Sequence, residues 1–163
     1  MTMYPPPPES AQPAQWSPHQ SGPRAGFWVR FGALLIDGIV VAVVPIILII
    51  VGAGGKSPGL VVIGYVLLIL GGIAYEIYFT GGPTGQTLGK RAVGIRVIDF
   101  NTGGSIGYGR AFLRLIGRWI SGIPCYLGYF WMLWDRERQC WHDKFANDVV
   151  VPVTAYPVAH WPN

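Results

Sequence analysis

Two long apolar blocks dominate the pattern of hydrophobic and polar positions along the chain. The first runs from Phe31 to Gly52 with a single charge at Asp37, and the second runs from Leu60 to Phe79 with Glu76 near its end. As helices they would extend about 33 Å and about 30 Å, enough to cross the hydrocarbon core of a bilayer. The short segment 53–59 is rich in glycine and predicts a turn. The pattern therefore predicts an antiparallel pair of transmembrane helices.

A third apolar stretch, Phe112–Trp134, is interrupted at Gly122-Ile-Pro124. It fits either one kinked span or a re-entrant hairpin of two short arms, each reaching about half-way across a bilayer. Short β-branched runs at 92–99 and 148–153 predict two strands that are able to pair. Pairing requires both strands on one side of the membrane, so the re-entrant hairpin is the favoured interpretation.

Composition and charge support a membrane protein. Hydrophobic residues make up 51% of the 163 residues and charged residues only 12%, which is about half the charged share of an average soluble domain. Basic residues flank the apolar blocks, with only Lys56 in the turn. By the positive-inside rule, both ends of the hairpin lie in the cytoplasm. The predicted fold class is an α-helical integral protein of the plasma membrane, with a transmembrane hairpin, the third apolar segment and two short cytoplasmic β-strands.

Composition also divides the chain into three regions. Residues 1–25 are rich in proline and poor in large apolar residues, which is typical of a disordered tail. A membrane domain is predicted over residues 26–153 and a C-terminal tail over 154–163. The run Tyr4–Pro8 is able to dock on an aromatic groove of a protein partner, although a solvated tail is the simpler interpretation. No secretory signal is recognisable at the start.

Asp37 lies within an apolar helix, where a charge costs about 2.5–3.5 kcal/mol, so it needs a partner or a proton. Arg30 lies two helical turns earlier on the same face, about 10 Å away, and Glu76 is expected at a similar depth in the second helix. We therefore predict an ion-paired triad of these three residues. Two interpretations stay open: a proton or cation site in which Asp37 changes charge during transport, or an ion-pair lock that fixes the helix packing.

The basic residues that follow the second block suggest contact with anionic lipid headgroups. The candidates are Lys90, Arg91, Arg96, Arg114 and Arg118. Basic residues spread over loops beside apolar blocks do not form the footprint of a nucleic-acid-binding protein. The expected partners are therefore the bilayer and other membrane subunits, including copies of the same chain, and not nucleic acid.

Motifs for catalysis or for a cofactor are incomplete. Cys140, His142 and Asp143 supply metal-ligand atoms within four residues, but a closed zinc site needs four ligands at recognised spacings. The glycine-rich segment 81–90 has neither the glycine spacing of a phosphate-binding loop nor the serine or threonine that follows its lysine. A nucleophile elbow and a zinc-protease motif are also missing. We predict no metal, no cofactor and no enzymatic activity.

Four motifs, taken together, carry a resemblance to a known family. They are Arg30 with Asp37 in the first helix, the run Thr87-Leu-Gly-Lys-Arg-Ala-Val-Gly-Ile-Arg-Val-Ile-Asp99, Arg114 in an apolar stretch, and Trp141-His-Asp-Lys144 before the last strand. This set resembles the RDD family of membrane proteins, which is named for one arginine and two aspartates. The resemblance covers roughly Gly26–Val153.

The resemblance implies roles for particular residues. Arg30 and Asp37 would be the first two signature residues, and Asp143 is the candidate for the third. The chain departs from the family pattern at Ala146-Asn147-Asp148, where the family usually has Ala-Gly-Thr, so a role of that threonine is not carried over. The proline-rich tail resembles the proline-rich antigens of mycobacteria in composition. The family resemblance points to transport but indicates no ligand.

Two functions of different class follow. The first is a small transporter or ion-coupled subunit with a buried Arg/Asp site, which must oligomerise because two spans cannot alone enclose a path. The alternative is a non-transporting membrane scaffold, which binds anionic lipid through its basic face and a protein partner through its proline-rich tail.

Overall fold

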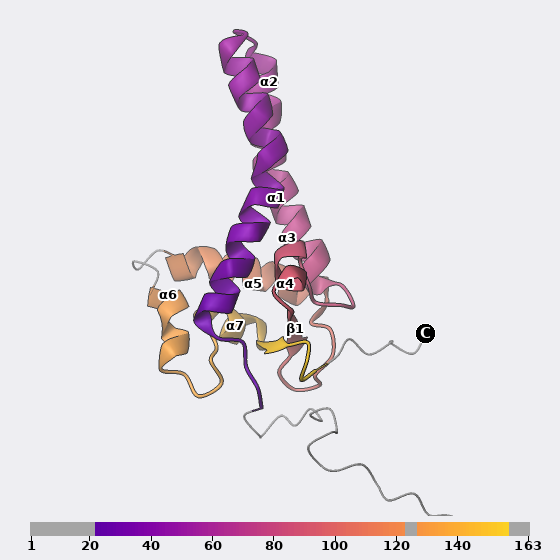
Figure 1. Ribbon diagram of the computed structural model, residues 1–163, viewed down its shortest axis with the longest axis vertical. Helices are drawn as coiled ribbons and strands as arrows, with labels where there is room; N and C mark the ends of the chain where they lie inside the picture. The colour runs from indigo at the N-terminus through magenta and orange to yellow at the C-terminus, as the bar shows by residue number, and fades with distance from the viewer. Residues whose placement is uncertain (1–21, 123–126, 157–163) are drawn as a thin grey trace, which may run out of the picture.

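The computed structural model describes residues 22–122 and 127–156. The residues predicted to form most of the proline-rich tail, 1–21, lie outside these ranges, as do 123–126 in the third apolar stretch and 157–163 at the C-terminus. Figure 1 shows the described chain as a long two-helix stem above a compact base.

The stem is the predicted antiparallel helix pair. Helix α1 runs over Phe27–Gly54, and the second helix runs from Pro58 to Gly81 as α2 (Pro58–Val66), a π-helical turn η2 (Leu67–Gly71) and α3 (Gly72–Gly81). Both are long and apolar enough to cross a membrane. Each is longer than the apolar block that predicted it, and α1 continues through Pro45 without a break.

The side chains of the stem face outward. In the most apolar window of each long helix only 11% of the residues are buried, and large hydrophobic side chains such as Ile39 and Ile50 are 64% exposed. The core helix of a soluble protein would bury such side chains, because water-soluble proteins rarely expose long contiguous apolar surfaces. The surface of the stem is therefore suited to lipid.

The base contains the remaining elements, several of which lie around the lower end of the stem (Figure 1). Its helical parts are α4 (Leu88–Ala92), α5 (Gly107–Gly122), α6 (Leu127–Phe130), the 3-10 turn η3 (Trp131–Leu133) and α7 (Trp141–Ala146). Its strands are β1 (Ile95–Asp99) and β2 (Asp148–Pro152).

The third apolar stretch is not one continuous span in the described residues. Helix α5 begins at Gly107, ends at Gly122 and crosses the lower end of the stem rather than extending it (Figure 1). It is amphipathic, because Ala111, Arg114 and Leu115 are buried while Phe112 and Trp119 are exposed. The described part of this stretch forms the separate helices α5 and α6. The single span and the re-entrant hairpin both stay predictions.

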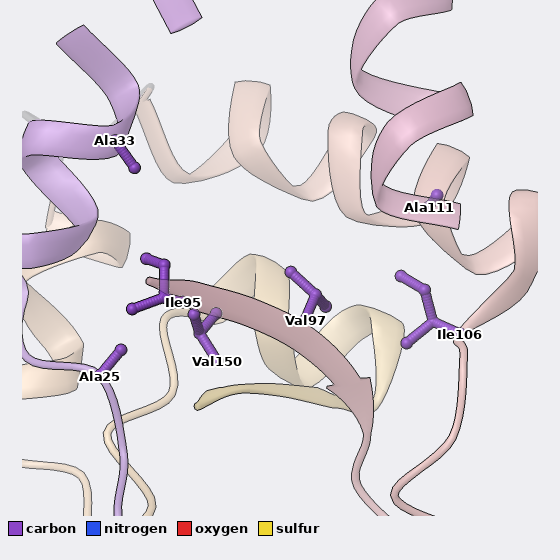
Figure 2. Close-up of a cluster of buried hydrophobic side chains, with 7 residues drawn as sticks. All are labelled: Ala25, Ala33, Ile95, Val97, Ile106, Ala111 and Val150. Carbon is purple, nitrogen blue, oxygen red and sulfur yellow. The ribbon is translucent and has the colours of Figure 1, made fainter. Parts of the chain in front are cut away.

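The two predicted strands pair in an antiparallel two-stranded sheet. Val97 lies opposite Val150, and Asp99 opposite Asp148. Both faces of the sheet are buried. One face packs in the cluster that Figure 2 shows, which contains Ala25, Ala33, Ile95, Val97, Ile106, Ala111 and Val150. The other face packs in a cluster of Ile98, Val149, Val151 and Tyr156.

The packed part of the chain extends beyond the predicted limits of 26 and 153. The amide of Ala25 donates a hydrogen bond of 2.9 Å to the Val150 carbonyl, and Arg24 Nη2 lies 2.5 Å from Glu137 Oε2. At the other end, Tyr156 is buried against β2. Segments whose composition predicts tails therefore join the base where a sheet face or an acidic partner receives them.

A substitution at Gly64 tests whether the two stem helices approach each other closely at this position. A Cβ atom there would lie 2.6 Å from Ile49 Cγ1 and 2.9 Å from the Pro45 carbonyl oxygen. Gly64→Ala should therefore lower the thermal stability of the purified protein in detergent by an amount equivalent to about 1–3 kcal/mol, through overpacking.

Gly71→Ala is the matched control for this substitution. A Cβ at Gly71 meets no atom within 4 Å, so this change should leave stability unchanged or raise it by up to about 1 kcal/mol. Equal destabilisation by the two substitutions would contradict the packing of α1 against α2.

Candidate functional site

Ionisable side chains from six elements meet in the base, just below the apolar part of the stem. They are Arg30 and Asp37 of α1, Glu76 of α3, Lys90 of α4, Arg114 and Arg118 of α5, Asp143 of α7 and Asp148 of β2. Four are acidic and four basic, and all except Arg30 and Arg118 belong to residues classed as buried. We refer to these eight residues as the charge network.

Asp143 connects three helices. Its Oδ2 accepts a hydrogen bond of 2.5 Å from Arg30 Nη1, and its Oδ1 lies 2.5 Å from Arg114 Nη1. The same Oδ2 accepts the Cys140 amide at 2.9 Å, which closes the capping box at the start of α7. Arg114 also forms an ion pair with Asp148. A single buried carboxylate therefore holds α1 and α5 against α7, and Arg114 continues the connection to the sheet.

Glu76 is the centre of a second group. Its Oε1 lies 3.1 Å from Lys90 Nζ and 2.9 Å from Arg118 Nη1. Lys90 Nζ also donates a hydrogen bond of 3.0 Å to Thr80 Oγ1, one helical turn after Glu76. These contacts hold α4 and α5 against the lower end of the stem.

Asp37 takes its partners from neutral groups. Tyr75 Oη and Thr87 Oγ1 each donate to it at 2.6 Å, and the Gly89 amide donates at 2.7 Å. Gly89 has no room for a side chain, because a Cβ would lie 2.2 Å from the Ala33 carbonyl oxygen. Three donors satisfy a buried carboxylate without an opposite charge. Asp37 thus attaches the start of α4 to the middle of the first stem helix.

The predicted triad of Arg30, Asp37 and Glu76 is not formed. Arg30 lies in the first turn of α1, where Asp143 and the Arg138 carbonyl accept its guanidinium hydrogens. Helical spacing placed Arg30 and Asp37 on one face, but α4 and α7 supply nearer partners for each. Those two segments are remote in sequence, so the spacing within α1 could not reveal them.

The predicted lipid-headgroup contacts are also corrected in part. Lys90, Arg96 and Arg114 are buried, at 8%, 3% and 4% exposure, so they contribute little charge to the outer surface of the protein. Arg118 is partly exposed and paired with Glu76. Arg91 is exposed and stays a prediction. The basic character of this region mostly serves contacts inside the protein.

Burial and neighbouring charges shift the pKa values of several side chains in the lower part of the structure. Burial tends to raise the pKa of Asp143, but Arg114 and then Arg30 outweigh it and hold that pKa well below its usual range. Burial raises the pKa of Asp148 to about 7, assisted by the Asp143 charge and opposed by Arg114. Burial, followed by the charge of Arg114, lowers the pKa of His142 well below its usual range, although Asp143 opposes the shift.

A cavity of about 90 Å³ lies within the charge network. Its wall includes Arg30, Asp37, Glu76, Lys90, Arg114 and Arg118 from the network, together with apolar residues of α1 and with Cys140 and His142. A cavity needs a volume of roughly 10–15 Å³ to hold one water molecule, so several waters or a small polar group would fit in this cavity.

Cys140, His142 and Asp143 could also hold a metal ion by geometry. One ligand atom from each lies within 4.8 Å of the others. Asp143, however, already binds two arginines, and positive charges at that distance oppose a cation. The Asp143 carboxylate is therefore better suited to its ion pairs with the two arginines than to binding a metal ion.

Sequence reasoning missed Tyr75, Thr87 and Asp148 as members of the site. Thr87 was noted only within a longer motif, and its position as the N-cap of α4 explains why it faces Asp37. Asp148 directly precedes a run of three valines, and an aspartate at the start of a buried strand was a signal for a buried charge needing a partner.

Comparisons with known proteins agree with the sequence motifs. The model of the RDD family matches residues 24–147. A proline-rich antigen homologue of Mycobacterium tuberculosis is 36% identical over 90 residues, covering 53% of this chain and 38% of that relative. The proline-rich antigen of Mycobacterium leprae is 32% identical over 83 residues, covering 49% of this chain and 33% of the relative. The matches therefore span well under half of both mycobacterial relatives.

A further relative matches over most of its own length. Protein YxaI of Bacillus subtilis is 28% identical over 147 residues, covering 78% of this chain and 96% of the relative. No solved structure matches the chain.

A double-mutant cycle tests the partner of Arg30. Removing one member of a buried ion pair costs about 3–5 kcal/mol, because the other charge stays buried. Arg30→Ala combined with Asp143→Ala should therefore be less destabilised than the sum of the single variants, with a coupling of about 0.5–3 kcal/mol in thermal or denaturant unfolding.

The matched cycle uses Arg30→Ala with Asp37→Asn. The two side chains have different hydrogen-bond partners, so their effects should be nearly additive. Strong coupling in this second cycle, and none in the first, would restore the triad that spacing alone predicts.

The pH dependence of unfolding tests whether His142 is buried and neutral in the folded chain. In the unfolded chain this histidine is protonated below about pH 6.5, whereas in the folded chain it stays neutral. Unfolding therefore takes up a proton at low pH, and the free energy of unfolding decreases as the pH is lowered. The loss should reach about 2 kcal/mol between pH 7 and pH 5. His142→Phe should lack this component in unfolding curves measured across that range. An unchanged pH profile in the variant would show that His142 is accessible to protons.

Proposed function

Because the chain belongs to the RDD family, we propose that it is an integral membrane scaffold subunit. The stem would cross the plasma membrane, and the base would lie at its cytoplasmic side with the proline-rich segment available to a protein partner. This orientation follows from the positive-inside rule, since Lys56 is the one charged residue between 38 and 75. A reporter enzyme fused after Asn163 measures the orientation directly.

The observation that carries the proposal is the internal pairing of the charges. Each of the four carboxylates of the charge network has ion-pair or hydrogen-bond partners from another element of the base or stem. A buried charge that is paired across two elements favours the arrangement of helices in which that pair forms. A rigid base on a membrane stem is suited to holding other proteins at the membrane.

The apolar part of the stem supports the same proposal. Between residues 38 and 75 both helices lack acidic side chains, and the single basic residue lies in the turn. A single copy therefore offers no chain of polar groups along which an ion would cross the bilayer. We propose no catalytic role, and the expected partners are lipid, further copies of the chain and other membrane subunits.

Ion-coupled transport by an oligomer is the second candidate. It is favoured by one observation, the cavity that Asp37 and Glu76 share with four basic residues. Carboxylates beside a polar cavity at the end of a membrane helix are the kind of group that carries protons or cations in transporters. This candidate requires several copies, because two helices do not enclose a path.

Ion flux separates the two functions. The full chain in proteoliposomes should show no proton or sodium flux above that of protein-free vesicles, because the charge network is closed by internal partners. A flux that Asp37→Asn abolishes, and that Asp135→Asn retains, would replace the scaffold proposal with the transport candidate. Asp135 is the matched control because it pairs with Lys144 outside the charge network.

A further inference from the structure

The cavity in the charge network has more basic than acidic groups in its wall. Arg30, Lys90, Arg114 and Arg118 face two carboxylates, Asp37 and Glu76. Glu76 pairs with two of these cations, because Lys90 and Arg118 both lie within 3.1 Å of its Oε1. Asp143 and Asp148 balance the other two arginines from outside the wall. Cations therefore outnumber carboxylates in the wall itself, and each of these cations also has an acidic partner.

Four buried polar atoms in or beside the wall of this cavity lack hydrogen-bond partners in the described structure. They are Arg114 Nε, which carries a donor hydrogen, His142 Nδ1, Asp143 Oδ1 and Asp148 Oδ2. Arg114 and His142 line the cavity and are almost completely buried, at 4% exposure each. An unsatisfied buried donor is costly, and native proteins usually supply it with an acceptor. A ligand oxygen at Arg114 would therefore add to the two carboxylates, Asp143 and Asp148, that already neutralise this arginine.

One wall of the cavity is apolar and leads to the surface of the stem. Phe27, Phe31 and Leu34 of α1 line it, and Phe31 and Leu34 are also 42% and 41% exposed. They belong to the first two turns of a helix whose following turns present an apolar surface suited to lipid. A ligand held here therefore meets cations at one end and a membrane-facing apolar surface at the other.

We propose that this cavity binds the phosphate group of an anionic phospholipid, with the acyl chains lying along α1. Phosphate oxygens accept the hydrogens that Arg114 and Arg118 present, and such charge-assisted bonds are strong. The acyl chains continue past Phe31 and Leu34 into the bilayer. The inference rests on the proposed membrane location, and it names a ligand and a site that the scaffold proposal leaves open.

Lipid titration of the full chain in detergent tests the site. We expect phosphatidylglycerol to remain bound in native mass spectrometry and to raise Tm, while phosphatidylcholine does neither. Sodium phosphate distinguishes a lipid headgroup from a free anion. A rise in Tm with phosphate equal to that with phosphatidylglycerol would overturn the lipid source, because the acyl chains would then contribute nothing.

Arg118→Gln and Arg91→Gln form a matched pair. Both remove one positive charge, but Arg118 lines the cavity and Arg91 is exposed on α4 outside it. Loss of one charge-assisted contact should weaken phosphatidylglycerol binding about tenfold or more in the first variant only. Equal weakening in both variants would indicate attraction to the overall basic charge and would overturn the proposal.

Leu34→Trp is a second variant, to be used if Arg118→Gln does not fold. It leaves every charge in place and narrows the entrance to the cavity. It should weaken phosphatidylglycerol binding without lowering the Tm of the lipid-free protein, and undiminished binding would count against the cavity. Flotation with phosphatidylcholine vesicles tests membrane insertion separately. Flotation without selectivity for phosphatidylglycerol would overturn this inference alone, whereas failure to float would overturn the proposed function.

Discussion

The base depends on the contact of one buried carboxylate, Asp143, with two arginines from different helices. Asp143 is inaccessible to solvent, so its charge is tolerable only because Arg30 and Arg114 reach it, each at 2.5 Å. The same contact fixes the position of the first turn of α1 relative to α5, which crosses beneath the stem. Loss of Asp143 would leave Arg30 without this acidic partner, and loss of either arginine would leave Asp143 with one cation in place of two.

Helix α5 shows how this constraint shapes the rest of the base. Its arginines, Arg114 and Arg118, lie one turn apart and face inward, one toward Asp143 and Asp148 and the other toward Glu76. Its outward residues are largely apolar, with Trp119 61% exposed. A helix with charges inside and apolar residues outside reverses the usual pattern of a soluble domain. It is consistent with a base that sits against a membrane and encloses its own polar core.

The two aspartates implied as family signature residues are stabilised in different ways. Asp143 is held by charges, whereas Asp37 is held by a tyrosine, a threonine and a backbone amide. The first arrangement joins helices by long and flexible side chains, and the second requires the backbone of α4 to approach α1 closely at Gly89. Together they explain why one arginine and two aspartates that are far apart in sequence contribute to one site.

The stem and the strands were accessible from the sequence by itself. Apolar blocks of bilayer length predict long apolar helices, and a glycine-rich turn between them predicts that they are antiparallel, so local pattern is sufficient for both. The runs around Val97 and Val150 likewise showed β-branched residues between turn signals. Asp37 and Glu76 were visible as charges that need partners because they lie within apolar blocks, whereas Asp143 was indicated only by the family resemblance.

Only the tertiary structure decided which charges meet. Arg30 and Asp143 are separated by 113 positions, and Asp37 and Gly89 by 52, so no periodicity within a helix relates them. The same holds for α5, whose apolar residues resemble a span until its arginines are seen to face a buried network. The physical reason is that helix and strand patterns arise from neighbouring residues, whereas the partner of a buried charge is chosen by whatever element packs against it.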